Sequence, residues 1–263
     1  MDRNSIIPVI GTAIVNGFHW LERLVLSVDY PVDTFVIFNN NGKGELTEDL
    51  DNLVKQPHPY IKNIVVCHMP TNIGVSGAWN LIIKSYMNAP YWIISNHDVA
   101  FIPGLLEEIA QAASDPEVGM VHPYGGDFGD GSWDLFLIKD WVIQSHGLFD
   151  ENLYPAYCED ADYIMRLKLS PVKIIPQLSR IHLHGAGPAN EYYTYGSQTK
   201  KVTPELNDRL DQINEINFEY LNQKWGPGWR MTNPQPTPFS IEGMPHTYTT
   251  YDLSYVRKKY LGF

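Results

Sequence analysis

Apolar runs alternate with segments of helical period along most of the chain. Runs rich in β-branched and aromatic residues predict strands, and apolar residues that recur every three or four positions predict helices. Strands are expected over residues 6–15, 34–38, 61–68, 91–95, 118–122, 133–138 and 172–175. Helices are expected over 20–28, a segment ending near 55, 81–87, 103–113, 140–144, 159–166 and 203–225. This alternation predicts an α/β fold with a doubly wound sheet, rather than a β-sandwich or a helical bundle.

Polar residues follow several of the predicted strands. The strand over 91–95 runs into Asn96-His97-Asp98, and asparagines follow the first two strands at Asn16 and at Asn39-Asn40. In open α/β sheets, ligands bind just beyond the carboxyl ends of the strands. We therefore expect Asp98 to lie in a ligand site, with a plain polar turn as the alternative.

Two glycine-containing stretches are expected to be loops. Asn72 to Asn80 carries Gly74 and Gly77 and leads into the predicted helix over 81–87. Its position after the third strand places it at the same edge of the sheet. A second stretch, Gly125 to Ser132, is either a loop near a ligand or a plain surface loop.

Acidic and imidazole side chains gather in the second half of the chain. Glu159-Asp160 opens the predicted helix over 159–166, where acidic residues usually only cap the helix, and Asp162 and Arg166 are spaced to pair along one helix face. His182 and His184 fall on the same face of a predicted strand. Two such histidines suit a metal ion if a carboxylate lies opposite, and a structural role is the alternative.

Composition narrows the class of protein. The 263 residues suit one large domain or two small ones, and 44% apolar content is enough for a globular core. With 19 basic against 30 acidic residues the net charge is −11, which argues against a nucleic-acid partner. A phosphate ligand would then need a metal ion or backbone donors. Only Cys67 and Cys158 are present, which suits a reduced, intracellular protein, although a single disulfide stays possible.

The sequence also carries no sign of a membrane-spanning or secretory segment. The first residues lead directly into a strand-like run, and no stretch approaches the roughly 20 apolar residues that cross a bilayer. We expect a soluble, cytoplasmic protein, or one peripheral to a membrane.

Several short motifs together carry a resemblance to a known family. They are Asn39-Asn40, Asn72-x-Gly74-x-x-Gly77-x-x-Asn80, Asn96-His97-Asp98 with Pro103-Gly104, Gly147-x-Phe149-Asp150-Glu151, Glu159-Asp160-x-Asp162-x-x-x-Arg166 and His184-Gly185. In this order and spacing, the chain resembles the family-2-like glycosyltransferases of GT-A fold over about residues 6–190. The closing segments 218–226 and 238–239 resemble the end of bacterial and large-virus sugar transferases of this group.

The resemblance implies an organisation and a donor site. It implies a GT-A type mixed sheet in a domain over 1–200, with a nucleotide-sugar-binding half over 1–100 and an acceptor and catalytic half over 101–200. A C-terminal helix and wrapping tail would occupy 201–263. The implied donor-binding residues are Asn16, Asn39, Asn40, Asn72, Gly74, Gly77, Asn80, Asn96, His97 and Trp133.

The implied reaction is an inverting transfer of a sugar from a nucleotide sugar, with a UDP-sugar as the first expectation, to a hydroxyl of a glycan or glycoconjugate. A departing diphosphate needs a divalent cation, and Mn²⁺ or Mg²⁺ bound by carboxylate and imidazole suits that task. The resemblance implies Asp98 as the ligand, completed by His184 or by its neighbour His182. Asn96 stands where the family commonly has an acidic residue, which weakens the cation site by one charge.

The acceptor hydroxyl must also lose a proton as it attacks, which calls for a positioned carboxylate. The resemblance implies Asp160 as this general base, beside Glu159, and an alternative is that Asp160 caps the helix while Glu159 or Asp162 is the base. A nucleotidyltransferase-like enzyme is a competing hypothesis, but residues 11–16 lack the basic, glycine-rich loop expected of one. An inactive module that binds nucleotide sugars is the third.

Overall fold

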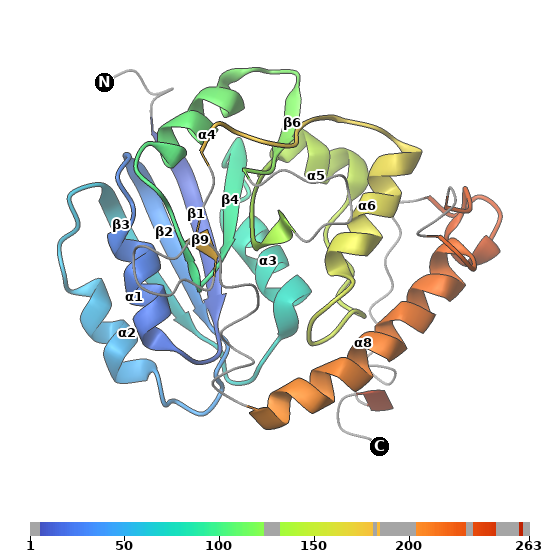
Figure 1. The fold of residues 1–263 in the computed structure, drawn as a ribbon, viewed down its shortest axis with the longest axis horizontal. Helices are drawn as coiled ribbons and strands as arrows, with labels where there is room; N and C mark the ends of the chain where they lie inside the picture. Colours follow the sequence, from blue (N-terminus) through green and yellow to red (C-terminus); the bar gives the residue numbers. More distant parts are fainter. Residues whose placement is uncertain are drawn as a thin grey trace.

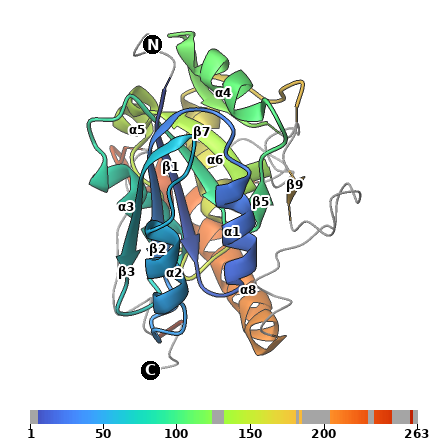
Figure 2. The same ribbon diagram turned by 90° about the vertical axis from the view of Figure 1, so that its left-hand side faces the viewer.

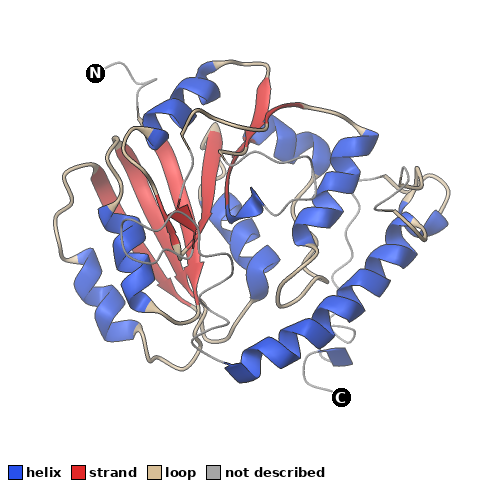
Figure 3. Ribbon diagram, viewed as in Figure 1, coloured by secondary structure: helices blue, strands red, loops and turns tan. Residues whose placement is uncertain are grey.

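The computed structural model describes residues 6–123, 132–180, 183–184, 204–229, 234–245 and 258–259. Its centre is a seven-stranded mixed sheet in the order β3-β2-β1-β4-β7-β6-β8 (Figures 1 and 3). The strands are β1 (Ile7–Ile14), β2 (Val32–Asn39), β3 (Ile61–His68), β4 (Tyr91–Asn96), β6 (Val118–Val121), β7 (Leu135–Lys139) and β8 (Lys173–Ile175). A separate two-stranded sheet joins β5 (Val99–Ala100) to β9 (Leu183–His184).

The first four strands of the large sheet are parallel. β1 pairs with β2 on one side and with β4 on the other, and β2 pairs with β3. β7 runs antiparallel to both β4 and β6, so the sheet is mixed. The α/β class and the doubly wound, mixed sheet are therefore confirmed, and the carboxyl ends of β1 to β4 meet at a single edge.

Helices cover both faces of this sheet (Figures 1 and 2). One apolar core lies under α1 (Phe18–Leu26), α2 (Thr47–Val54) and α4 (Leu105–Ser114). The other lies under α3 (Gly74–Ser85), α5 (Asp140–His146), α6 (Glu159–Leu169) and α8 (Pro204–Trp225). Strands buried on both faces lack a polar side, which is why the central strands are continuous apolar runs in the sequence.

α3 begins earlier than the sequence indicates. The prediction of a loop over 72–80 and a helix over 81–87 is wrong, because the helix already starts at Gly74 and ends at Ser85. The oxygen of the Asn72 side chain accepts a hydrogen bond from the Gly74 amide at 2.8 Å and so helps to begin the helix. Asparagine and glycine suggested a loop, but here they form the start of a helix.

Gly11 allows α3 to pack closely on β1. A Cβ atom at Gly11 would lie 2.5 Å from Cγ2 of Ile82, well inside contact distance. This close packing fixes the start of α3 relative to the carboxyl end of the sheet.

Trp133 lies outside the strand in which it was predicted. It belongs to the short 3₁₀ helix η2 (Ser132–Asp134), and β7 begins at Leu135. Its ring centroid lies 4.9 Å from that of His122 and 4.9 Å from that of Phe136. This aromatic packing turns the chain just before the strand starts.

The predicted C-terminal helix is present as α8, which lies along the α6 side of the molecule (Figure 1). Leu221 and Trp225 are buried against the second core. The short 3₁₀ helix η3 (Pro238–Ser240) contacts α8, and most of the predicted tail lies outside the described residues. Across the described residues, we find no helix whose length and apolar character would allow it to span a bilayer.

Candidate active site

Backbone hydrogen bonds tie together the loops that follow the first three parallel strands. The Asn40 amide donates to the carbonyl of Ile14 at 2.8 Å, and the Met69 amide donates to that of Asn39 at 3.0 Å. The side-chain amide of Asn41 donates to the Val15 carbonyl at 2.9 Å. The polar residues at the carboxyl edge, called here the donor edge, therefore have a defined arrangement.

The two predicted asparagines after β2 have different environments. Asn39 is 3% exposed, and its side-chain amide donates to Nδ1 of His68 at 3.0 Å while its oxygen accepts the Asn41 amide at 3.1 Å. Asn40 is 2% exposed, and its amide lies 3.4 Å from the Gly74 carbonyl. Within the described residues, the side-chain oxygen of Asn40 has no hydrogen-bond partner. Asn40 therefore keeps an acceptor for a ligand, whereas Asn39 serves to join β2 to β3.

The start of α3 is covered by a second loop. Gly74 has a φ of +78°, and a Cβ atom there would lie 2.8 Å from the ring of Tyr154. The Val75 amide donates to the Pro155 carbonyl at 2.7 Å, and the Tyr154 hydroxyl donates to the Asn72 carbonyl at 2.8 Å. The loop around 154–157 is thus docked on the donor edge.

Of the remaining residues predicted in this stretch, Asn80 is the most constrained. Its amide donates to the Phe149 carbonyl and to the Glu151 carboxylate, both at 2.9 Å, and its oxygen accepts the Phe149 amide at 2.9 Å. Asn80 therefore links α3 to the loop after α5. Gly77 is buried in α3 and would tolerate a Cβ atom, since the nearest atom, Cβ of Ile73, would lie 3.5 Å away.

Asp98 lies where the fourth parallel strand meets the small sheet. His97 is 5% exposed and Asp98 is 3% exposed, whereas Asn96 is half-buried. Val99, the residue that follows Asp98, pairs with His184 across β5 and β9. A Cβ atom on Gly17 would lie 3.7 Å from Nε2 of His97, which brings the loop after β1 next to this position.

Two of the predicted cation ligands lie in neighbouring segments of the main chain, because Asp98 directly precedes Val99 in β5, which pairs with His184 in β9. A carboxylate oxygen and an imidazole nitrogen are donors that suit Mn²⁺ or Mg²⁺. His182 lies outside the described residues. Among the described side chains, no group of three or more His, Cys, Asp or Glu residues is placed to hold a metal ion.

The acidic pair follows a strained turn. Tyr157 and Cys158 both have left-handed backbone conformations, with φ of +76° and +71°. For residues other than glycine, this conformation costs roughly 1–2 kcal/mol each. α6 then begins at Glu159, so two unusual backbone conformations set the direction in which Glu159-Asp160 enters the site.

The two acidic residues differ in burial. Glu159 is 8% exposed, and burial, together with the neighbouring charge of Asp160, raises its pKa to about 8. Glu159 is therefore mainly protonated at pH 7. Asp160 is only half-buried, and its carboxylate accepts a hydrogen bond from the Ala161 amide at 2.7 Å. Asp160 is the more accessible carboxylate of the pair.

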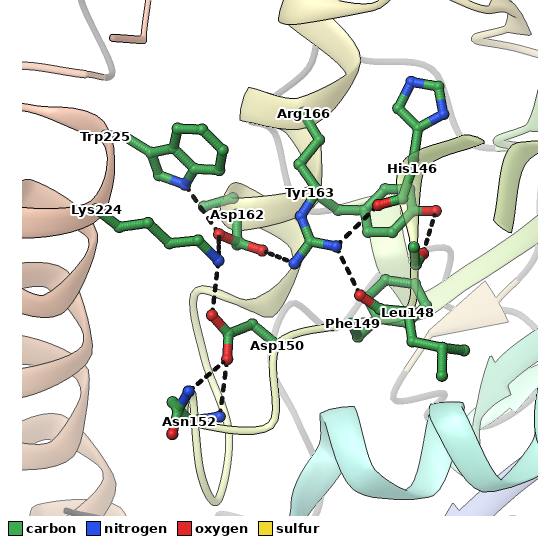
Figure 4. A network of polar contacts seen from close by, with 12 residues as sticks. His146, Leu148, Phe149, Asp150, Asn152, Asp162, Tyr163, Arg166, Lys224 and Trp225 are labelled. Atoms are coloured by element: carbon green, nitrogen blue, oxygen red, sulfur yellow. Dashed lines mark hydrogen bonds and ion pairs between the residues drawn. The ribbon is translucent and has the colours of Figure 1, made fainter. Parts of the chain in front are cut away.

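A network of buried charges joins α6, α8 and the loop after α5 (Figure 4). Lys224 donates to Asp150 at 2.6 Å and lies 2.7 Å from Asp162. Arg166 pairs with the other oxygen of Asp162 at 2.5 Å and donates to the Leu148 carbonyl at 2.6 Å. All four charged side chains are 0% exposed. The predicted pairing of Asp162 with Arg166 is confirmed. Burial by itself would raise the pKa of Asp162, but the charges of Arg166 and Lys224 outweigh burial and lower that pKa.

Sequence reasoning missed Lys224 as a member of this network. A signal was present, because Lys224 lies one helical turn from the apolar Leu221 and next to Trp225 on the face of α8 that packs inward. The indole of Trp225 donates to Asp162 at 2.8 Å. A lysine on the apolar face of a helix indicates a buried partner carboxylate.

Two solved structures have a similar arrangement of elements. GalNAc-T7, solved with UDP, GalNAc and Mn²⁺, superimposes with a TM-score of 0.59 over 87% of this chain and 50% of its own, at 14% identity. The mannosyltransferase PcManGT from Pyrobaculum calidifontis, solved with GDP-Man and Mn²⁺, gives 0.51 over 72% of this chain and 58% of its own, at 13% identity. The match thus covers between 50% and 58% of the length of these two proteins. The fold is that of the GT-A glycosyltransferases.

Sequence comparison identifies the family. Residues 11–164, more than half of the chain, match the model of glycosyl transferase family 2, and the chain belongs to this family. A galactofuranosyl glycosyltransferase of Leishmania donovani is 24% identical, over 89% of this chain and 71% of its own length. The protein is therefore a glycosyltransferase, which decides against the nucleotidyltransferase hypothesis.

Removing the Lys224 cation should destabilise the fold. In Lys224→Met the apolar stem is largely kept, but Asp150 and Asp162 lose the cation that contacts both of them, and uncompensated buried charge typically costs about 3–5 kcal/mol. Urea unfolding should show a loss of that order. The matched control is Lys84→Met, because Lys84 is 47% exposed and 3.6 Å from Glu151, and it should change stability by less than about 1 kcal/mol. Equal losses in the two variants would contradict the importance of the buried pairing.

Glu159→Gln should change how stability depends on pH. Because the folded pKa of Glu159, about 8, exceeds the ordinary value of 4.5, the native state holds its proton more tightly than the unfolded state. Its contribution to stability is complete below pH 4.5 and is lost as pH rises towards 8. The variant should match wild type at pH 4.5 and exceed it by about 2–4 kcal/mol at pH 8 in urea unfolding. Glu242→Gln, at an exposed position, is the control, and a similar pH response in both variants would refute the raised pKa.

Proposed function

We propose that this glycosyltransferase moves a sugar from a UDP-sugar to a hydroxyl of a glycan or glycoconjugate, with inversion at the anomeric carbon. One observation carries the proposal: the loop around 154–157 is docked on the start of α3, so the helix that begins with Glu159-Asp160 is anchored to the donor edge. A nucleotide sugar bound at the donor edge would then lie within reach of the acidic pair. The UDP bound by GalNAc-T7 and the galactofuranosyl transfer named for the Leishmania relative support this choice of donor class.

The nucleotide would be read mainly by polar groups at the donor edge. Asn40 offers its side-chain oxygen, and Asn16, Asn72, Asn96 and His97 follow strand ends at this edge. Gly74 gives the loop around 154–157 room to dock on the start of α3, and Gly77 is buried within that helix, so both would contribute to the nucleotide pocket by shaping its wall. Asn39, Asn80 and Trp133, whose side chains are occupied by packing or hydrogen bonds, would support these loops indirectly.

A divalent cation, Mn²⁺ or Mg²⁺, would be held by Asp98 with His184, or with His182 as the alternative. The pairing of β5 with β9 supports the first choice, since it brings the backbone of His184 beside Val99, the residue that follows Asp98. When bound, the cation would neutralise charge that develops on the departing diphosphate. The Mn²⁺ in both structural neighbours supports a cation of this kind.

Asp160 would act as the general base. The acceptor hydroxyl oxygen forms a bond to the anomeric carbon, the bond from that carbon to the diphosphate breaks, and the hydroxyl proton passes to the Asp160 carboxylate. Glu159 is a poor base near neutral pH because its buried carboxyl keeps its proton until about pH 8. Attack opposite the departing diphosphate produces inversion.

Substitution of Asp98 should weaken cation binding. Asp98→Asn keeps the shape of the side chain but removes its charge, so calorimetry should show Mn²⁺ affinity lowered by about tenfold or more, and donor affinity lowered with it. Asn96→Ala should have a smaller effect, since Asn96 contributes no charge. Unchanged Mn²⁺ affinity in Asp98→Asn would refute the assignment of Asp98 as a ligand.

Substitution of Asp160 should stop transfer while leaving donor binding intact. In Asp160→Asn, kcat should fall by about 10²–10⁴, because loss of a positioned base typically costs that much. The donor Kd should change by less than about threefold. Asp49→Asn, which alters an exposed aspartate in the first turn of α2, is the matched control and should be silent.

Two outcomes would contradict the proposal for Asp160. One is transfer by Asp160→Asn within about threefold of wild type. The other is a retained anomeric configuration of the wild-type product by NMR. Donor binding without any transfer or hydrolysis by the wild type, with and without Mn²⁺, would instead favour the inactive binding module.

A further inference from the structure

The turn before the acidic pair is held from behind by α8. Asn217, which is 0% exposed, donates through its side-chain amide to the carbonyls of Ala156 at 3.0 Å and Tyr157 at 2.9 Å. The side-chain oxygen of Asn217 in turn accepts a hydrogen bond from Lys259 at 2.8 Å. The N–H groups of the Asn217 amide therefore hold the turn, and its oxygen is held by Lys259.

Lys259 extends the support to a second loop. Besides Asn217, its ammonium donates to the backbone carbonyl of Asn152. Asn152 follows Asp150, which belongs to the buried network of charges. Lys259 therefore links the loop after α5 to the side chain that holds the turn.

The turn has a particular need for such support. Tyr157 and Cys158 are both left-handed, a conformation that residues other than glycine rarely adopt unless neighbouring groups impose it. Asn217 bonds the carbonyls of two successive residues in this turn. Because Glu159 follows Cys158 directly, relaxation of the turn would rotate the first residues of α6.

Anchoring of α8 does not depend on Asn217. Further along the same helix, Lys224 and Tyr220 bond to Asp150, and Trp225 bonds to Asp162. These contacts fix α8 against α6 and the loop after α5. The bonds of Asn217 go instead to the turn, so its removal should disturb the turn more than the docking of the helix.

We propose that Asn217 and Lys259 are positioning residues for sugar transfer, which hold the turn at 156–158 so that Asp160 faces the acceptor hydroxyl. The inference rests on the proposed role of Asp160. Both residues lie beyond the segment 11–164 that matches the family model, so this support comes from the C-terminal part of the chain. Neither residue contacts the substrate in this proposal.

Asn217→Asp is the deciding variant. It keeps the size of the side chain and an oxygen for Lys259, but it removes both N–H donations and places a charged oxygen against two carbonyls. We expect kcat to fall by about 10- to 100-fold, while the donor Kd changes by less than about threefold and the product stays inverted. Asn222→Asp on the same helix is the matched control, since the Asn222 amide bonds to Glu219 near the surface, and it should be silent.

The buried Cys158 thiol reports on the turn independently of activity. In a Cys67→Ser background, Cys158 is the remaining thiol, and it should react slowly with a thiol reagent in the folded protein. Asn217→Asp should make it react faster, and Asn222→Asp should not. Lys259→Met should raise the reaction rate of Cys158 and lower kcat, each by less than Asn217→Asp does. Lys259→Arg, which keeps a cation, should have most of the kcat that Lys259→Met loses.

The outcomes separate this inference from the proposed function. If Asp160→Asn is inactive but Asn217→Asp keeps kcat within about twofold of the Asn222→Asp control, the inference fails alone. A loss of kcat accompanied by an equal loss of donor affinity would show a general structural role and would also overturn it. If Asp160→Asn stays active, the proposed function fails. Should Asn217→Asp not fold, Lys259→Met against Lys259→Arg decides by the same measurements.

Discussion

Four charges buried in one place determine how α6, α8 and the loop after α5 are assembled. Asp150, Asp162, Arg166 and Lys224 are withdrawn from water, and their formal charges sum to zero. Removing ions from water is costly, and the cost is recovered only if every partner is present with good geometry. The carboxylates come from a loop and from α6, while the lysine comes from α8. Their mutual neutralisation therefore requires segments that are far apart in sequence to come together.

The donor edge depends on a different constraint. Parallel strands place their carboxyl ends together, so the polar residues after β1, β2, β3 and β4 gather without any one of them being decisive. The loop around 154–157 then joins this edge to the start of α6. The two segments are thus connected by one hydrogen bond between backbone groups, from Val75 to Pro155, and by one from the Tyr154 hydroxyl to the Asn72 carbonyl.

The sequence was sufficient for the sheet and for most helices, because long apolar runs and helical periods dominate local structure. The start of α3 was misplaced, because Asn72 and Gly74 are residues that usually form loops. Here they begin a helix whose first turn is held by a hydrogen bond to the carbonyl of Pro155, a residue far away in the sequence. Trp133 was also assigned to a strand, because a tryptophan beside an apolar run gives no indication that it packs on His122 instead.

The candidate site was accessible to sequence reasoning only in part. Asp98, Asp160 and the asparagines could be named from their positions after strands and before a helix. The protonation of Glu159 could not, because it depends on burial that only the folded chain supplies. Lys224 was overlooked since a lysine in a helix is normally solvent-exposed. The left-handed turn at Tyr157 and Cys158 gave no sequence signal, because neither residue type favours that conformation.

The buried charges also restrict how this chain can change over time. A substitution that neutralises Asp150 or Asp162 leaves a surplus positive charge, and one that neutralises Lys224 leaves a surplus negative charge, so single steps at these positions pass through an unbalanced protein. The C-terminal helix is therefore matched in charge to α6 and the loop after α5. A recombinant enzyme that joins these segments to the tail of another family member must bring a cation to the place of Lys224, whatever else the new tail contains.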